Sequence, residues 1–177
     1  MPEKKRILAV PGSTRSRSVN LHILQAIASL YEGKLAVEIY DGLDQLPHFN
    51  PDLDKDPLPP AVASLRKKME LADGIVICTP EYVFSLPGSL KNAIEWMVST
   101  TILTGKPAAL ITASSSGQKA HESLDLVMRT VGVKLGEKGS LLIQGPKTKI
   151  TEEGVITDET TLASLKELVD DFLTLLN

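Results

Sequence analysis

Short apolar runs alternate with helical patterns along this chain, and this alternation restricts the possible folds more than any other feature. Residues 6–10, 74–78 and 107–113 are short, almost wholly apolar and followed by proline, glycine or small polar residues, which is typical of buried strands. Apolar and polar residues alternate over 34–40, as expected of a half-buried strand. A further apolar run predicts another strand around residues 140–144.

Segments with helical character separate these strands. The predicted helices cover residues 20–31, 60–72, 88–98, 121–131 and 158–176. Strands joined through helices form a mainly parallel sheet, and strands that are apolar throughout suit a sheet covered on both faces. The pattern therefore predicts the flavodoxin-like α/β fold, a three-layer sandwich whose five-stranded parallel sheet has the order 2-1-3-4-5.

Length and composition favour a single domain over residues 1–177. The chain has 177 residues, of which 42% are hydrophobic, enough for a sizeable core. Its formal net charge of −3 argues against a nucleic-acid partner, which usually meets a basic surface. No apolar run approaches the roughly 20 residues that span a bilayer, and no signal-peptide pattern is found. We therefore expect a cytoplasmic protein with no membrane partner.

The loop between the first strand and the first helix is rich in hydrogen-bond donors. Its sequence is GSTRSRSVN, residues 12–20. A helix N-terminus attracts phosphate, Ser13 and Ser18 offer hydroxyl groups, and Arg15 offers a two-pronged charged contact. The nucleotide motifs GxxxxGK[ST] and GxGxxG are both absent. The loop favours a phosphate site over the alternative, which is a solvated turn with helix-capping serines.

A second loop, TPEYVFSLPGSLKNAIEW, follows the third predicted strand at residues 79–96. Its two prolines stiffen the turn, so that backbone groups can be aimed at a flat ring. Tyr82 lies at the carboxyl end of the strand, which favours contact with an aromatic ligand. In the alternative interpretation the prolines only shape the start of a helix, while Phe84 and Trp96 belong to the core. For Trp96 we favour the core.

Together, the two loops resemble the NADPH-dependent FMN reductase family, which includes bacterial chromate and quinone reductases and flavin-dependent azoreductases. The family motif Gly-Ser-x-Arg-x-x-Ser-x-Asn is matched by Gly12, Ser13, Arg15, Ser18 and Asn20. The second motif is matched from residue 80 to 96, except that Val83 stands where the family usually has asparagine. The loop after the fourth predicted strand also lacks the family's Gly-Gly-x-Arg segment.

The resemblance implies FMN as the cofactor, with its phosphate in the first loop and its ribityl chain and ring against the backbone of the second. The candidate cofactor-binding residues are Ser13, Arg15, Ser18, Val19, Asn20, Pro80, Glu81, Tyr82, Val83, Ser114 and Gly117. The candidate substrate-binding residues are Tyr82 and Ser85. We expect no catalytic side chain, because the cofactor carries the hydride chemistry.

By the same resemblance, the chain is an FMN-dependent oxidoreductase that takes hydride from NADPH or NADH. Its electrons pass to a small-molecule acceptor, namely a quinone, azo compound, free flavin or metal oxyanion. The resemblance also implies a homodimer or homotetramer in which neighbouring subunits wall the flavin site. The alternatives are a flavodoxin-like electron carrier and a non-catalytic flavin-binding protein. An electron carrier would show a strongly acidic docking face. The small net charge of this chain is a weak argument against the carrier interpretation.

Several other residues suggest no separate site. His22, His48 and His121 lack the paired spacing of metal ligands, so we interpret them as surface or capping residues. Cys78 is the only cysteine and ends an apolar run, which predicts a small core residue. The acidic segment at 52–56 is most simply a solvated loop.

Overall fold

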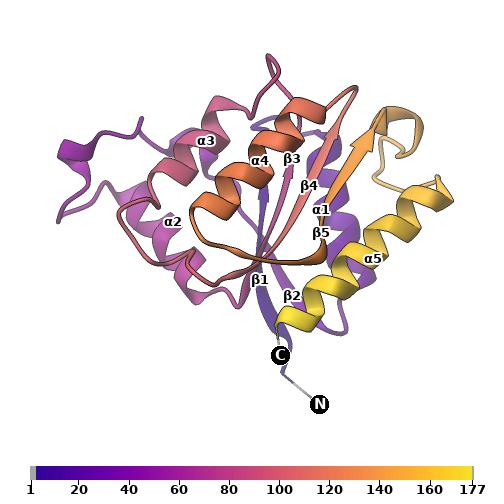
Figure 1. Cartoon of the computed structure of the whole chain (residues 1–177), viewed down its shortest axis with the longest axis horizontal. Coiled ribbons are helices and arrows are strands. Elements are labelled where there is room, and N and C mark those ends of the chain that lie inside the picture. The colour runs from indigo at the N-terminus through magenta and orange to yellow at the C-terminus, as the bar shows by residue number, and fades with distance from the viewer. Residues whose placement is uncertain (1–2, 177) are drawn as a thin grey trace.

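A five-stranded parallel sheet forms the centre of the protein in the computed structural model, which describes residues 3–176 (Figure 1). The strands are β1 (Lys5–Pro11), β2 (Leu35–Ile39), β3 (Gly74–Thr79), β4 (Pro107–Ser114) and β5 (Lys134–Gln144). Their order is β2-β1-β3-β4-β5, and every neighbouring pair is parallel. The predicted fold class and strand order are confirmed.

Helices cover both faces of the sheet. They are α1 (Val19–Leu30), α2 (Pro60–Leu71), α3 (Gly88–Glu95), α4 (Gln118–Thr130) and α5 (Glu159–Leu175). Successive side chains of a strand point to opposite faces, so Leu8 and Val10 pack with α2, α3 and α4, whereas Ile7 and Ala9 pack with α1 and α5. Within residues 3–176, no helix is long and apolar enough to cross a membrane.

Three elements differ from the predicted ranges by more than one residue at an end. β5 begins at Lys134 because its pairing with β4 shifts between Ala108 and Leu110, and this shift accommodates the polar residues 136–139 inside the strand. α4 begins at Gln118, directly after Gly117. α3 ends at Glu95, since the amides of the next turn bond three residues back instead of four.

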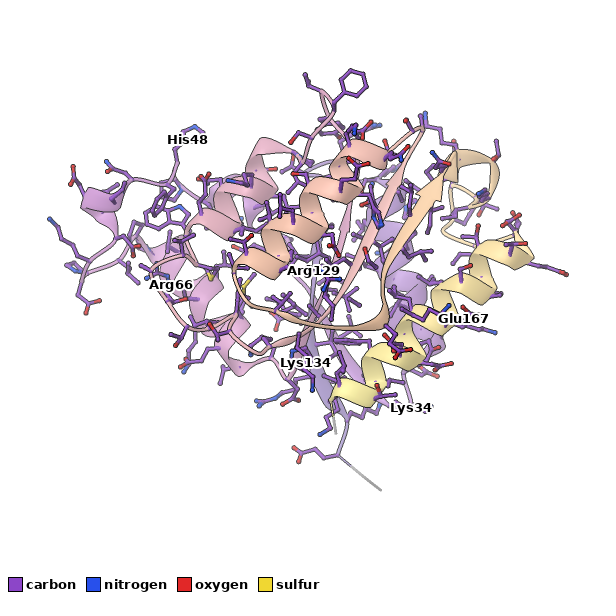
Figure 2. The ribbon with its side chains drawn as sticks, viewed as in Figure 1. Lys34, His48, Arg66, Arg129, Lys134 and Glu167 are labelled. Atoms are coloured by element: carbon purple, nitrogen blue, oxygen red, sulfur yellow. The ribbon has the colours of Figure 1, made fainter. Side chains whose placement is uncertain are left out.

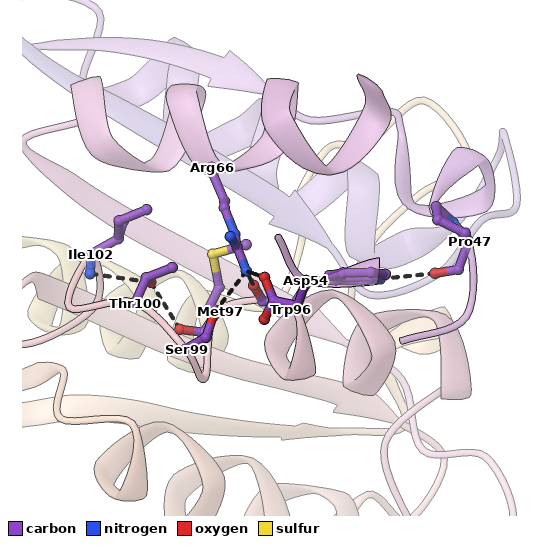
Figure 3. A network of polar contacts seen from close by, with 8 residues as sticks. All are labelled: Pro47, Asp54, Arg66, Trp96, Met97, Ser99, Thr100 and Ile102. Carbon is purple, nitrogen blue, oxygen red and sulfur yellow. Dashed lines mark hydrogen bonds and ion pairs between the residues drawn. The ribbon is translucent and has the colours of Figure 1, made fainter. Parts of the chain in front are cut away.

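The long loop at residues 41–59 is fastened to α2 and α3. The Nε1–H of Trp96 donates to the Pro47 carbonyl at 2.8 Å, and the buried indole meets the Phe49 ring edge-on at 5.1 Å. Arg66 on α2 pairs with Asp54 at 2.7 Å (Figure 3). The core interpretation of Trp96 is therefore confirmed.

Four of the five residues at 52–56 are exposed, as predicted for a solvated segment, and Asp54 is the exception. Its side chain is only 7% exposed, because the Arg66 guanidinium packs against it and neutralises its charge. His48, on the same loop, is exposed and projects away from the sheet, as predicted for a surface residue (Figure 2).

Candidate active site

Three loops lie side by side at the end of the sheet where β1, β3 and β4 terminate. The strand register pairs Pro11 with Cys78 and Thr79 with Thr112, so the residues that follow these strands are neighbours. We call residues 12–18 the first loop, 80–87 the second loop and 114–117 the third loop. Ligands of open parallel sheets bind at the carboxyl ends of the strands, next to the point where the strand order reverses.

The first loop passes very close to the end of β3. The Gly12 N–H donates to the Cys78 carbonyl at 2.8 Å. A Cβ at Gly12 would overlap Thr79 Oγ1 and lie 2.7 Å from Thr79 Cβ, so only glycine fits here. This close approach fixes the position of the donors that follow.

Two serines of the first loop are buried. The Ser18 hydroxyl accepts the Leu21 N–H at 3.1 Å, which confirms helix capping for this residue. Its own hydrogen stays free to donate to a ligand. Ser13 Oγ accepts the Arg15 N–H at 3.3 Å and lies 3.4 Å from the Tyr82 hydroxyl. The first and second loops therefore touch.

The other residues of the first motif differ from one another in exposure. Arg15 is exposed, and among residues 3–176 no carboxylate forms an ion pair with it. Val19 is half-buried at the start of α1. Asn20 is 98% buried, and its Oδ1 accepts the Cys78 thiol at 3.3 Å. Burial raises the pKa of this thiol, which keeps it protonated and leaves the Asn20 NH₂ group for another acceptor.

A tight hairpin forms the tip of the second loop. Tyr82 and Ser85 exchange two backbone hydrogen bonds of 3.0 Å each. Val83 and Phe84 between them have φ angles of 51° and 56°, both in the left-handed region, as in a type I′ turn. The exposed fraction of Phe84 is 76%, so the core interpretation is wrong for this residue. The tip of this hairpin is therefore exposed.

Glu81 links the second loop to the start of α4, which follows the third loop. Its carboxylate accepts the Ala120 N–H at 2.9 Å, in the first turn of α4, where a negative charge is favourable. Ser114 ends β4, and the buried Gly117 precedes α4 with a φ of 81°. This Glu81 contact could not be predicted from local patterns, since its partner lies 39 residues away. Pro80, which precedes Glu81, is also buried.

A small pocket of about 130 Å³ lies on the other side of the first loop. Arg15 and Ser13 line one wall, and Tyr40, Asp41 and Asp44 line the other. Burial, with smaller contributions from the two aspartates, raises the pKa of Tyr40. These residues were missed, although Asp41 directly follows a predicted strand and so had to lie at this edge.

The model of the family described as NADPH-dependent FMN reductase matches residues 5–145. The chain belongs to this family. It is 33% identical over 172 residues to the NADH:(hydroxy)cinnamate reductase subunit CrdA of Vibrio ruber, covering 94% of this chain and 84% of that one. It is 30% identical to a 2-hydroxy-1,4-benzoquinone reductase of a Burkholderia species, covering 94% and 93%.

A solved structure agrees with this assignment. The flavoenzyme FerB, an NAD(P)H:(acceptor) oxidoreductase of Paracoccus denitrificans, superposes with a TM-score of 0.80 at 30% identity, over 97% of each chain. The predicted oxidoreductase class, the cofactor FMN and the reductant NAD(P)H are thereby confirmed. The residues present fit FMN: the Asn20 side chain is held in place with its Oδ1 on the Cys78 thiol, the Ser18 hydroxyl caps α1, and Arg15 is an exposed cation beside the N-terminus of α1.

Proposed function

We propose that the chain reduces quinones with electrons from NADH or NADPH, through FMN held between the first and second loops. The contact of 3.4 Å between Ser13 Oγ and the Tyr82 hydroxyl carries this proposal. It brings a loop rich in hydrogen-bond donors that suit a phosphate directly beside an aromatic hairpin. Both lie at the carboxyl ends of the strands, where such sheets bind ligands. The benzoquinone reductase relative supports the choice of acceptor.

In this proposal the first loop holds the FMN phosphate. Arg15 gives a charged, two-pronged hydrogen bond, the Ser13 and Ser18 hydroxyls and the Asn20 amide donate, and α1 begins at Val19 with free backbone N–H groups. None of these groups needs to move a proton. The buried serines and asparagine are fixed in place before the ligand arrives, which lowers the entropic cost of binding.

The second and third loops hold the rest of the cofactor. The backbone from Pro80 to Val83 meets the ribityl chain and ring, while Ser114 and Gly117 approach from β4. Glu81 keeps the two loops together through α4. FMN held by these residues would supply the hydride chemistry between the nicotinamide and the acceptor. Tyr82 and Ser85 shape the space for the acceptor, and no side chain acts as acid or base.

The proposal also includes a homodimer or homotetramer of single FMN-binding domains, each spanning residues 1–177. Its support is the exposure of two apolar side chains, Leu53 in the loop at residues 41–59 at 46% and Val98 after α3 at 64%. A cytoplasmic location, and the absence of nucleic-acid and membrane partners, stay predictions.

Substitution of Arg15 tests the cofactor site. Arg15→Ala should weaken FMN binding about ten- to a hundredfold, the value of one charged hydrogen-bond pair, while riboflavin binding stays nearly unchanged because riboflavin has no phosphate. Quenching of flavin fluorescence measures both affinities. Arg17→Ala, an exposed arginine of the same loop, is the matched control and should leave both affinities unchanged. Equal losses for the two ligands would refute the phosphate assignment.

The acceptor is tested separately. Wild-type protein loaded with FMN should oxidise NADH or NADPH steadily when a quinone is supplied. A protein that binds FMN but oxidises neither nicotinamide in the presence of quinones would be an electron carrier instead.

A further inference from the structure

The tip of the second loop, which we call the apolar tip (Val83 and Phe84), adopts a backbone conformation that its residues do not favour. Both have φ angles in the left-handed region, at 51° and 56°. Type I′ turns favour asparagine or glycine at these positions, and a β-branched residue there is a true outlier. The turn itself therefore does not explain why valine stands at position 83.

Packing inside the chain does not explain the apolar tip either. Val83 is 95% exposed and Phe84 is 76% exposed, and neither belongs to a hydrophobic cluster of the core. Tyr82 beside them is 46% exposed. Strain combined with an exposed apolar surface indicates a contact with something outside the chain.

The position of the apolar tip restricts what that contact can be. Two hydrogen bonds of 3.0 Å close the hairpin, and the Tyr82 hydroxyl at its base lies 3.4 Å from Ser13 in the first loop. The apolar tip is thus rigid and stands at the rim of the cofactor site. A molecule that comes to the flavin from this side meets Val83 and Phe84 first.

The segment that carries the apolar tip has no charged side chain of its own. Residues 82–90 contain no acidic or basic side chain, and the nearby Glu81 carboxylate is held by the first turn of α4. A charged acceptor gains no ion pair from this segment. An uncharged aromatic acceptor gains apolar contact with both side chains.

We propose that the Val83–Phe84 tip selects the electron acceptor and favours uncharged aromatic quinones over charged ones. This inference rests on the proposed function, since it specifies the substrate class of the same site. It also gives a consequence to the valine that stands where the family motif usually has asparagine.

The test compares two acceptors of similar shape, 1,2-naphthoquinone and its anionic 4-sulfonate. For FMN-loaded wild type, Val83→Asn and Phe84→Asn, kcat/KM is measured with each acceptor at saturating NADH or NADPH. The ratio of the two values within one variant cancels any change in FMN loading. We expect each substitution to lower the ratio of uncharged to charged acceptor about five- to tenfold, mainly through KM of the uncharged quinone.

Asparagine suits the left-handed turn, so both variants should fold at least as stably as the wild type. Val155→Asn is the matched control, because Val155 is 58% exposed and lies outside the three loops. An unchanged ratio in Val83→Asn and Phe84→Asn would overturn the inference. So would an unchanged ratio with loss of the oligomer in sedimentation, which would make the apolar tip a subunit contact. Wild-type protein that reduces neither quinone would instead overturn the proposed function.

Discussion

Replacing Asp54 with alanine should destabilise the protein through an ion pair that lies far from the cofactor site. In the folded chain Arg66 donates to Asp54 Oδ1 at 2.7 Å, to the Trp96 carbonyl at 3.0 Å from Nε, and to Ser99 Oγ at 3.0 Å (Figure 3). The Asp54 and Arg66 side chains are only 7% and 13% exposed. Asp54→Ala leaves the guanidinium buried without its carboxylate.

The size of the loss follows from this environment. Breaking a buried ion pair by removing one partner costs about 3–5 kcal/mol. Asp54 lies in a surface loop, and Arg66 keeps the Trp96 carbonyl and Ser99 as acceptors, so we expect a lower value of about 2–3 kcal/mol. For a chain of this length that corresponds to a fall in Tm of about 5–10 °C.

Urea unfolding followed by Trp96 fluorescence measures this effect directly, since Trp96 is the only tryptophan and belongs to the same network. The double variant Asp54→Ala/Arg66→Met is the control and should recover part of the loss, because it removes the orphaned charge. A loss below about 0.5 kcal/mol for Asp54→Ala would refute the reasoning, since solvent-exposed pairs have that value.

The same pair predicts a pH dependence. A hydrogen bond from Ser99, opposed by burial and assisted by Arg66, holds the pKa of Asp54 below its ordinary value of 3.8. The carboxylate therefore stabilises the fold fully above that value, and its contribution disappears as the pH falls through the lowered pKa. The stability difference between wild type and Asp54→Ala should shrink below about pH 4.

Two further substitutions test the site and the sheet beneath it. Gly12→Ala should cost about 1–3 kcal/mol in urea unfolding and weaken FMN at least tenfold in flavin titrations, because its Cβ would overlap Thr79 and displace the first loop; unchanged FMN affinity would refute the close approach. His121 lies with Nδ1 3.2 Å from Thr112 Oγ1 and Nε2 3.2 Å from Ser140 Oγ, and burial lowers its pKa from 6.5. The wild type should therefore lose stability relative to His121→Gln as the pH falls from 7 to 5, and a constant difference in urea unfolding would contradict this.

The strands were predictable to the extent that burial makes them continuously apolar. β1, β3 and β4 lie in the interior of the sheet, and their predicted ranges are within one residue of those observed at either end. β5 is an edge strand whose first half is polar, and a carboxylate from α5 occupies the space beside Gly136. Its first half pairs with β4 across a register shift and contacts Asp171, 33 residues beyond Lys138, and local patterns reveal neither contact.

The candidate site divides in the same way. The first and second loops are continuous segments, so their motifs and positions after β1 and β3 could be recognised directly. The contacts that join the loops could not, because Glu81 meets Ala120 and Ser13 meets Tyr82 only through the fold. Asp54 shows the same limit. The local sequence around it would be the same whether its side chain were exposed to solvent or paired with Arg66.

Position 83 shows how a residue visible in the sequence changes meaning when backbone angles are known. As a departure from the family motif, Val83 indicates one polar side chain fewer near the cofactor. Its φ of 51° adds a second consequence, because asparagine is the residue that accepts this conformation readily. Replacing asparagine by valine therefore removes a hydrogen-bonding group and also strains the turn. A strained turn with an apolar side chain 95% exposed is stable only because its base is fixed by the hairpin bonds, and it gains free energy when an apolar molecule covers it.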